Sequence, residues 1–219
     1  MKLIIQLVLW VIIIFLGYKL YDSIIGPVQF NKTKVERYEK VIAKLKDIKE
    51  SQLAHQEITG NYAGNWDSLV RFIDTAKYAI TERRDSSYAD VEKNKAYGIE
   101  SGYFIDVIVV DTIGFRAVKD SLFAGGDRYK TMMDVPGTEA QFELDAGKLE
   151  KNGVEYSVFE AKVHKRVVLE GMNDDLIVQE LQVNSVDGVN GPTIKIGSMD
   201  EINTSGNWPK LYDKAKDQE

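Results

Sequence analysis

The sequence predicts an α+β fold: an N-terminal transmembrane helix that continues into an amphipathic helix, then a small, mainly antiparallel β-sheet domain. Three observations support this. An apolar run opens the chain, a charged stretch with helical spacing follows it, and the runs of β-branched residues are confined to the second half. Helices followed by strands are typical of α+β proteins with antiparallel sheets rather than of alternating α/β folds.

The apolar run covers residues 3–25, and only Gln6 and Gly17 interrupt it as far as Tyr18. A helix rises about 1.5 Å per residue and a bilayer core is about 30 Å thick, so the span must extend to about residue 25. No pair of small residues marks a cleavage site after it. We therefore expect residues 1–25 to form an uncleaved signal anchor rather than a cleaved signal peptide.

Three residues of this span are unusual in lipid: Gln6, Trp10 and Asp22. Polar groups inside a membrane usually find a partner, and a tryptophan usually sits at the interface rather than at the centre. We expect these residues to contact another membrane helix. Lysines on both sides of the span leave the direction of insertion open. A short N-terminus before a large domain favours a single-pass protein of the bacterial inner membrane with a periplasmic C-terminal domain.

The second helix is expected over residues 26–58. Gly26 and Pro27 should kink or break the chain after the anchor. Apolar side chains then recur every three or four residues, which predicts an amphipathic helix; they are Val35, Tyr38, Val41, Ile42, Leu45 and Ile48. This stripe either packs on its own domain or, through Val41, Leu45 and Ile48, contacts a partner.

The remaining domain is expected over residues 59–209, followed by a charged tail over residues 210–219. Asn65 should cap a third helix that begins at Trp66 and ends near Ile80, and the polar residues 83–95 suggest a solvated helix or loop. The run of β-branched residues at 103–111 predicts a central strand. Further strands are expected over residues 115–119, 140–145, 154–164 and 193–197.

Turn residues organise the later part of this domain. Asn152-Gly153 between two strand-like runs predicts a hairpin. Residues 166–170 and 176–179 are shorter strand candidates, although Asn173 with two following aspartates could instead start a helix. Trp208 lies outside any periodic pattern, so it either pins the C-terminal segment onto the sheet or contacts a partner.

Composition argues against several kinds of chemistry. The 219 residues include no cysteine and two histidines, and the net charge is −6. Disulfides and thiolate sites are thereby excluded, and a nucleic-acid partner is disfavoured. His55 and His164 lack the neighbours of a catalytic triad or zinc motif, and no phosphate-binding or calcium loop is present. We expect a non-enzymatic protein without catalytic residues, metal or cofactor.

The first 80 residues resemble type IV pilins and pseudopilins in layout. The apolar helix runs into a charged amphipathic helix and then a loop that contains Gly60-Asn61-Tyr62 and leads to Asp67-Ser68-Leu69. The resemblance implies a subunit of a filament or secretion system. The processing glycine and early glutamate of that family are absent, and Gln6 is the nearest polar residue.

The globular part resembles a group of inner-membrane-anchored envelope proteins of Bacteroidota. The matching segments are residues 119–123, 135–138, 142, 146–147 and 158–161. Such proteins are associated with ExbB/ExbD-type proton-channel modules. The resemblance implies an accessory subunit that binds ExbB/ExbD-like membrane and periplasmic proteins in a motor for outer-membrane transport, with self-association as a further option.

Overall fold

The computed structural model describes residues 2–100 and 102–212, except for the side chain of Asp22. It divides into two compact units, which we describe separately. Unit 1 contains the chain up to Val70 and from Asp127 onward, and unit 2 contains residues 71–126. The single domain expected over residues 59–209 is thus divided, and the helix expected as a linker belongs to unit 1.

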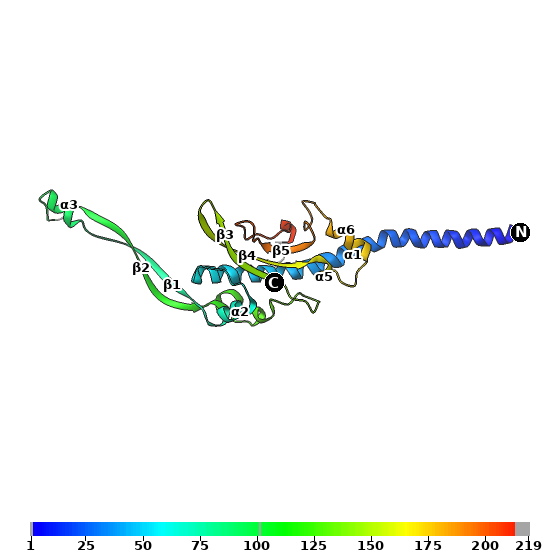
Figure 1. The fold of residues 1–219 in the computed structure, drawn as a ribbon, viewed down its shortest axis with the longest axis horizontal. Helices are drawn as coiled ribbons and strands as arrows, with labels where there is room; N and C mark the ends of the chain where they lie inside the picture. The colour runs from blue at the N-terminus through cyan, green and yellow to red at the C-terminus, as the bar shows by residue number, and fades with distance from the viewer. Residues whose placement is uncertain (1, 101, 213–219) are drawn as a thin grey trace. The chain divides into compact units, whose positions relative to one another are not determined.

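Helix α1, Lys2–Thr59, is one continuous helix of 58 residues (Figure 1). Its N-terminal part is long and apolar enough to cross a membrane, and none of its most apolar window is buried. The predicted break at Gly26–Pro27 is wrong, because Pro27 lies inside the helix. A proline removes one helical hydrogen bond. The long helix-forming stretches on both sides of Pro27 outweigh that loss, because propagating an existing helix is far easier than nucleating a new one.

The second half of α1 supplies the core of unit 1. Its apolar stripe is buried, with at most 1% of each side chain exposed at Tyr38, Val41, Ile42, Leu45 and Ile48. This part of α1 packs against strands β4 (Val154–His164) and β5 (Thr193–Gly197) and helix α5 (Lys165–Val168). The prediction that the stripe packs on its own domain is confirmed.

Strands β3 (Glu143–Lys151), β4 and β5 form an antiparallel sheet in that order. The predicted hairpin is present, since Lys151 pairs with Val154 across a two-residue turn. Both turn residues have positive φ, 56° at Asn152 and 77° at Gly153, as a type I′ turn requires. Strands β4 and β5 match their predicted bounds, while β3 begins later than expected.

Strand β5 ends at a glycine that no other residue could replace without strain. Gly197 has a φ of +76°, and a Cβ there would collide with the carbonyl oxygen of Phe159 on β4. Its amide donates to the carbonyl of Ser205 at 3.1 Å, which joins the C-terminal segment to β5. The glycine therefore allows two neighbouring backbones to approach β5 at once.

Short helices replace two predicted strands in unit 1. Residues 166–170 lie in and after α5, and residues 176–179 lie in α6 (Asp174–Leu181), so the strand predictions there are wrong. The alternative helix start is confirmed, because the Asn173 side chain accepts a hydrogen bond from the Leu176 amide at 3.1 Å. The cap and the acidic first turn outweigh the β-branched residues of α6. A 3₁₀ turn, Arg128–Thr131, completes the short elements.

Unit 2 consists mainly of an antiparallel ribbon of β1 (Lys77–Ala89) and β2 (Phe104–Ala117), with α3 (Val91–Ala96) at its tip and α4 (Val118–Phe123) after it (Figure 1). Helix α2 (Trp66–Thr75) precedes the ribbon. The predicted Asn65 cap is confirmed by a 2.8 Å hydrogen bond from the Ser68 amide. The prediction of a helix to Ile80 is wrong, because β1 begins at Lys77. Of the helix or loop expected over residues 83–95, β1 occupies residues 83–89, whereas α3 confirms a helix over residues 91–95.

Candidate interaction surface

Outside the N-terminal part of α1, the β1–β2 ribbon is the feature of the described chain that most clearly exposes apolar side chains. Its pairing runs from Lys77–Ala117 at the base to Ala89–Phe104 near the tip, with one irregularity after Ile80. A hydrogen bond of 3.0 Å from the Val118 amide to the Ala76 carbonyl closes the base. A two-stranded ribbon is at best marginally stable in water by itself, so this length of pairing requires an explanation.

The two strands differ sharply in chemistry. Between its ends β1 carries Glu82, Arg83, Arg84, Asp85, Ser86 and Ser87. The facing part of β2, residues 106–111, has an apolar centre, Val-Ile-Val-Val, between Asp106 and Asp111. Several apolar side chains of β2 are more than half exposed; these are Phe104 (59%), Ile108 (66%) and Val110 (53%). The polar centre of β1 thus pairs with a stretch of β2, residues 107–110, whose composition is that of a sheet interior.

The register places apolar residues of β2 on both faces of the ribbon. Successive side chains of a strand point to opposite faces. Phe104, Ile108 and Val110 therefore share one face, and Ile105, Val107 and Val109 share the other. Strands that are apolar on both faces are typical of buried, central positions. The sequence predicts a central strand here, yet within the described residues β2 pairs with β1 alone.

The tip of the ribbon is ordered by side-chain contacts. Asp90 caps α3 by accepting from the Lys93 amide at 2.9 Å. The Asn94 side chain donates to the Tyr103 carbonyl and accepts from its amide, at 3.0 and 2.8 Å. The rings of Tyr97 and Tyr103 lie 5.2 Å apart, with the Lys93 ammonium 4.9 Å from the Tyr103 ring. The tip therefore holds a defined conformation while it exposes aromatic surface.

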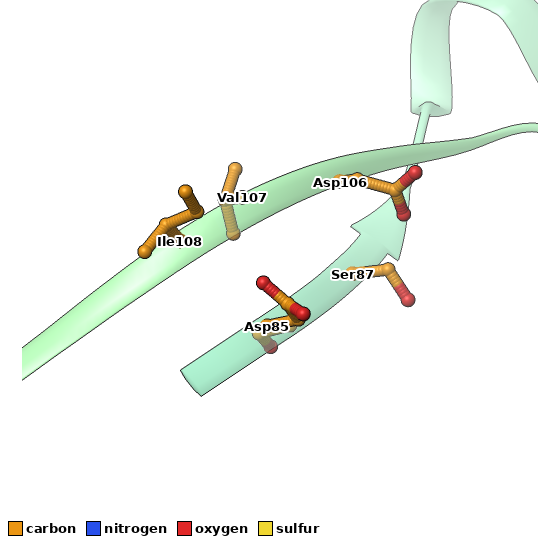
Figure 2. Close-up of a pocket in the computed structure, with 6 residues that line it drawn as sticks. Asp85, Ser87, Asp106, Val107 and Ile108 are labelled. Atoms are coloured by element: carbon orange, nitrogen blue, oxygen red, sulfur yellow. The ribbon is translucent and has the colours of Figure 1, made fainter. Parts of the chain in front are cut away.

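A shallow hollow of about 440 Å³ lies on the ribbon (Figure 2). Figure 2 labels Asp85, Ser87 and Asp106, whose side-chain oxygens are red, and Ile108 lies on the same face by register. The carboxylates of Asp85 and Asp106 at its border are groups that can bind a metal ion. Among the described residues no group of three or more His, Cys, Asp or Glu side chains could hold one. The hollow is better understood as part of the surface of an incomplete sheet.

The residues predicted to contact a partner in the membrane lie on α1. Gln6 and Trp10 are exposed there, with 59% of Trp10 accessible. Asp22 belongs to the same helix, and its side chain is outside the described residues. The contact predicted for these three residues stays a prediction.

The structure does not leave all the residues predicted for the soluble part free for a partner. Val41, Leu45 and Ile48 have no exposed surface, so they serve the core instead. A narrow apolar stripe has the same spacing whether its own domain or another chain covers it. Trp208 is half-buried, and a Cβ on Gly206 would collide with its ring. Gly206 forms a bridge with Ile196, which confirms that this segment is pinned onto β5.

The charged groups buried in unit 1 have structural roles. The fully buried Lys165 ammonium donates to the Glu180 carbonyl, the Glu180 carboxylate and the Val189 carbonyl, at 2.8, 3.1 and 2.7 Å. Glu180 also accepts from Lys34 and Tyr38 of α1. Burial lowers the pKa of Lys165, although its hydrogen bond to Glu180 opposes this, and burial with the Glu180 charge raises the pKa of Tyr38. This cluster fixes α1 to α5 and α6.

A second charged cluster lies on the sheet. Glu160 accepts from Lys162 at 2.8 Å and from Lys195 at 2.7 Å. Burial opposes the ionisation of Glu160, but the two lysines outweigh burial and hold its pKa below the ordinary value. The Glu160 carboxylate joins β4 to β5 through these contacts, and both lysines act as its ion-pair partners.

The two histidines have local roles. His164 accepts from the Arg166 amide at 3.2 Å and so caps α5. The Nδ1 atom of His55 lies 2.6 Å from the Asn61 carbonyl and 3.0 Å from the Thr59 hydroxyl. These contacts close the loop after α1, in line with the structural role expected for both residues.

Sequence reasoning missed the ribbon because β1 gives almost no strand signal. Its central residues are charged or hydroxylated, and strand propensity alone does not select them. The available signal was indirect: the centre of β2 is too apolar to lack a paired strand, and residues 77–89 precede it by a connection of fewer than twenty residues. A search for a partner of β2 would have found β1.

No family model, curated protein or solved structure matches this chain. The functional argument therefore rests on the residues themselves.

Proposed function

We propose that this protein is a non-enzymatic, single-pass membrane protein that serves as an interaction subunit of a bacterial cell-envelope complex, with its folded part in the periplasm. The observation that carries the proposal is the ribbon of unit 2, whose strand β2 exposes apolar side chains on both faces. Monomeric proteins rarely leave large apolar patches uncovered. A ribbon of this composition favours a role in binding another polypeptide.

The N-terminal part of α1 supports the membrane assignment. Its side chains are exposed and apolar over a length sufficient to cross a bilayer. Burial in lipid would remove this surface from water and stabilise the protein accordingly. Gln6 and Trp10 would then be available to a neighbouring membrane helix.

The leading candidate for the complex is an ExbB/ExbD-type proton-channel motor that energises outer-membrane transport. Support for this choice comes from the sequence resemblance of the globular part to anchored envelope proteins of Bacteroidota. In such an assembly α1 would contact membrane subunits, while the ribbon would contact periplasmic ones.

Purification of the tagged full-length chain in mild detergent tests the proposal. We expect ExbB/ExbD-like subunits to co-purify, and we expect Ile108→Asp to reduce their recovery at least severalfold because it places a charge in an apolar contact. Val186→Asp is the matched control, since Val186 is 91% exposed in a loop of unit 1. Recovery of the chain without any such subunit would contradict the choice of complex, and its absence from the membrane fraction would contradict the function.

A pilin-like filament subunit is the alternative. The continuity of α1 from its apolar part into the core of unit 1 favours it, since a filament subunit needs a helix that reaches from the membrane into a folded head. Mass spectrometry of the mature protein distinguishes the two proposals. An intact N-terminus supports the envelope subunit, and removal of a leader peptide supports the pilin-like one.

A further inference from the structure

Strand β2 has one edge that no described residue pairs. Its backbone groups on that edge form a ready template for another strand. Natural proteins usually protect such an edge with charged residues or prolines, yet residues 107–110 of β2 read Val-Ile-Val-Val. The unprotected edge and the two apolar faces together indicate that β2 occupies an inner position once the protein is assembled.

We infer that the free edge of β2 pairs with β1 of a second copy of this chain, so that ribbons join edge to edge. The chain already contains one strand suited to β2, namely β1. Within one copy the Arg84 guanidinium lies 2.9 Å from the Asp111 carboxylate. The outer edge of β1 is also unpaired by any described residue, so each ribbon offers both halves of such a joint.

Charge and direction distinguish this joint from the pairing of two β2 strands. This step rests on the proposed anchoring, because copies held by the same end in one membrane present their ribbons in the same direction. Two β2 strands that run in the same direction and in register would bring Asp106 beside Asp106 and Asp111 beside Asp111, and like charges in such positions are destabilising. Pairing β2 with β1 of the next copy keeps the ribbons in one direction without this repulsion.

One register of β2 against β1 of the second copy places opposite or uncharged side chains across from each other. It sets Asp111 opposite Arg84 of the second copy and Val107 opposite Tyr88 of the second copy. Asp106 then faces Ala89, so that no like charges lie directly opposite each other between residues 104 and 112 of β2. Because this register also keeps equivalent faces of the two ribbons on the same side, it can repeat from copy to copy. Such head-to-tail contacts close into rings or extend as filaments.

Cysteine cross-linking tests this register without interference from native cysteines, because the chain contains none. The register sets Ser86 of one copy opposite Val109 of the next. Facing residues of antiparallel strands lie about 4.5–5.5 Å apart, within the range that a disulfide spans. Two full-length variants with different tags, Ser86→Cys and Val109→Cys, are co-expressed and oxidised in membranes.

We expect the mixed dimer to exceed either homodimer at least severalfold. The same pair with Asp111→Arg in both chains should cross-link about fivefold less, since Arg84 then faces a like charge. Placing Asp111→Arg only in the Val109→Cys chain and Arg84→Asp only in the Ser86→Cys chain should restore the yield. The opposite charges then meet only between copies while the pair within each copy stays broken, which excludes simple loss of the ribbon as the cause. Val186→Cys, in a loop of unit 1, reports collisional background.

Three results would overturn the inference. The first is a dominant Val109→Cys homodimer, which would show pairing between β2 strands. The second is a cross-link from Val109→Cys to a different protein in place of the mixed dimer. The third is a mixed dimer no stronger than the Val186→Cys background in a chain that fractionates with membranes. In that last case the proposed function stands, whereas absence from the membrane fraction would refute the function itself.

Discussion

Single residues of unit 1 show how much of its stability rests on buried charge. Lys165 has no exposed surface, and its three hydrogen bonds all go to acceptors of the loop and helix that follow α5. We expect Lys165→Met to lower the free energy of unfolding by about 3–5 kcal/mol, because it leaves the Glu180 carboxylate without its most deeply buried cation. Chemical denaturation of the detergent-solubilised chain followed by circular dichroism measures this.

Lys148→Met is the matched control for that experiment. Lys148 pairs with Glu155 at 2.9 Å, but both side chains are more than half exposed. Exposed ion pairs are worth about 0–1 kcal/mol, so this variant should unfold close to the parent chain. Equal losses from the two substitutions would contradict the role assigned to burial.

Glu160 gives the expected dependence on pH. Its pKa is lower in the folded chain than in the unfolded one, so its contribution to stability is complete above the unfolded pKa and is lost as the pH falls through the folded value. We expect Glu160→Gln to be less stable than the parent at pH 7. Thermal unfolding from pH 7 down to pH 3 should show this gap closing below about pH 4.5. A gap that persists unchanged at pH 3 would contradict the assignment.

At the scale of elements, the end of β5 can be tested by two glycines. Gly197 and Gly137 have nearly the same φ, +76° and +78°, but a Cβ at Gly197 collides with β4 whereas one at Gly137 meets nothing within 4 Å. Gly137→Ala should cost about 1–2 kcal/mol for the left-handed backbone alone. Gly197→Ala should cost clearly more, because strand β5 must move away from β4. Similar melting temperatures for the two variants would refute the steric argument.

Elements that depend on residues close together in the chain were predictable from the sequence. Strand β4, the Asn152–Gly153 turn and the Asn65 cap each depend on residues close together in the chain, and the structure confirms them. Strand β1 and the continuity of α1 at Pro27 were not predictable in this way. The first depends on pairing with residues 15 to 40 positions away in the chain, and the second on cooperative helix formation over both flanks.

The candidate site was predictable only in part. The apolar composition of β2 was visible, and it indicated a strand with two covered faces. That these faces would be exposed could not be read from the sequence, because the same pattern describes a strand in the middle of any sheet. The apolar stripe of α1 differs from β2 in the opposite direction. Its spacing suited an exposed partner surface, but its side chains are buried in the core.

At the scale of the whole molecule, the anchor can be tested by labelling single cysteines. In cells with a permeabilised outer membrane, we expect Val186→Cys to react with a membrane-impermeant maleimide, as a periplasmic residue should. Ile13→Cys should remain unlabelled until detergent and denaturant are added, because the proposed membrane span would place residue 13 at bilayer depth. Labelling of Ile13→Cys at the rate of Val186→Cys in native membranes would contradict a transmembrane position.

The uninterrupted course of α1 has a mechanical consequence. An α-helix has 3.6 residues per turn, so each residue sets a rotation of about 100° about the axis. Without a break near Pro27, the azimuth of Gln6 and Trp10 is tied to that of the stripe that carries Val41 and Leu45. A turn of the membrane part about its own axis would therefore act as a torque on the core of unit 1. In the proposed anchored protein, α1 would therefore transmit a rotation between membrane and core, and the angle between its two ends is set by the number of residues between them.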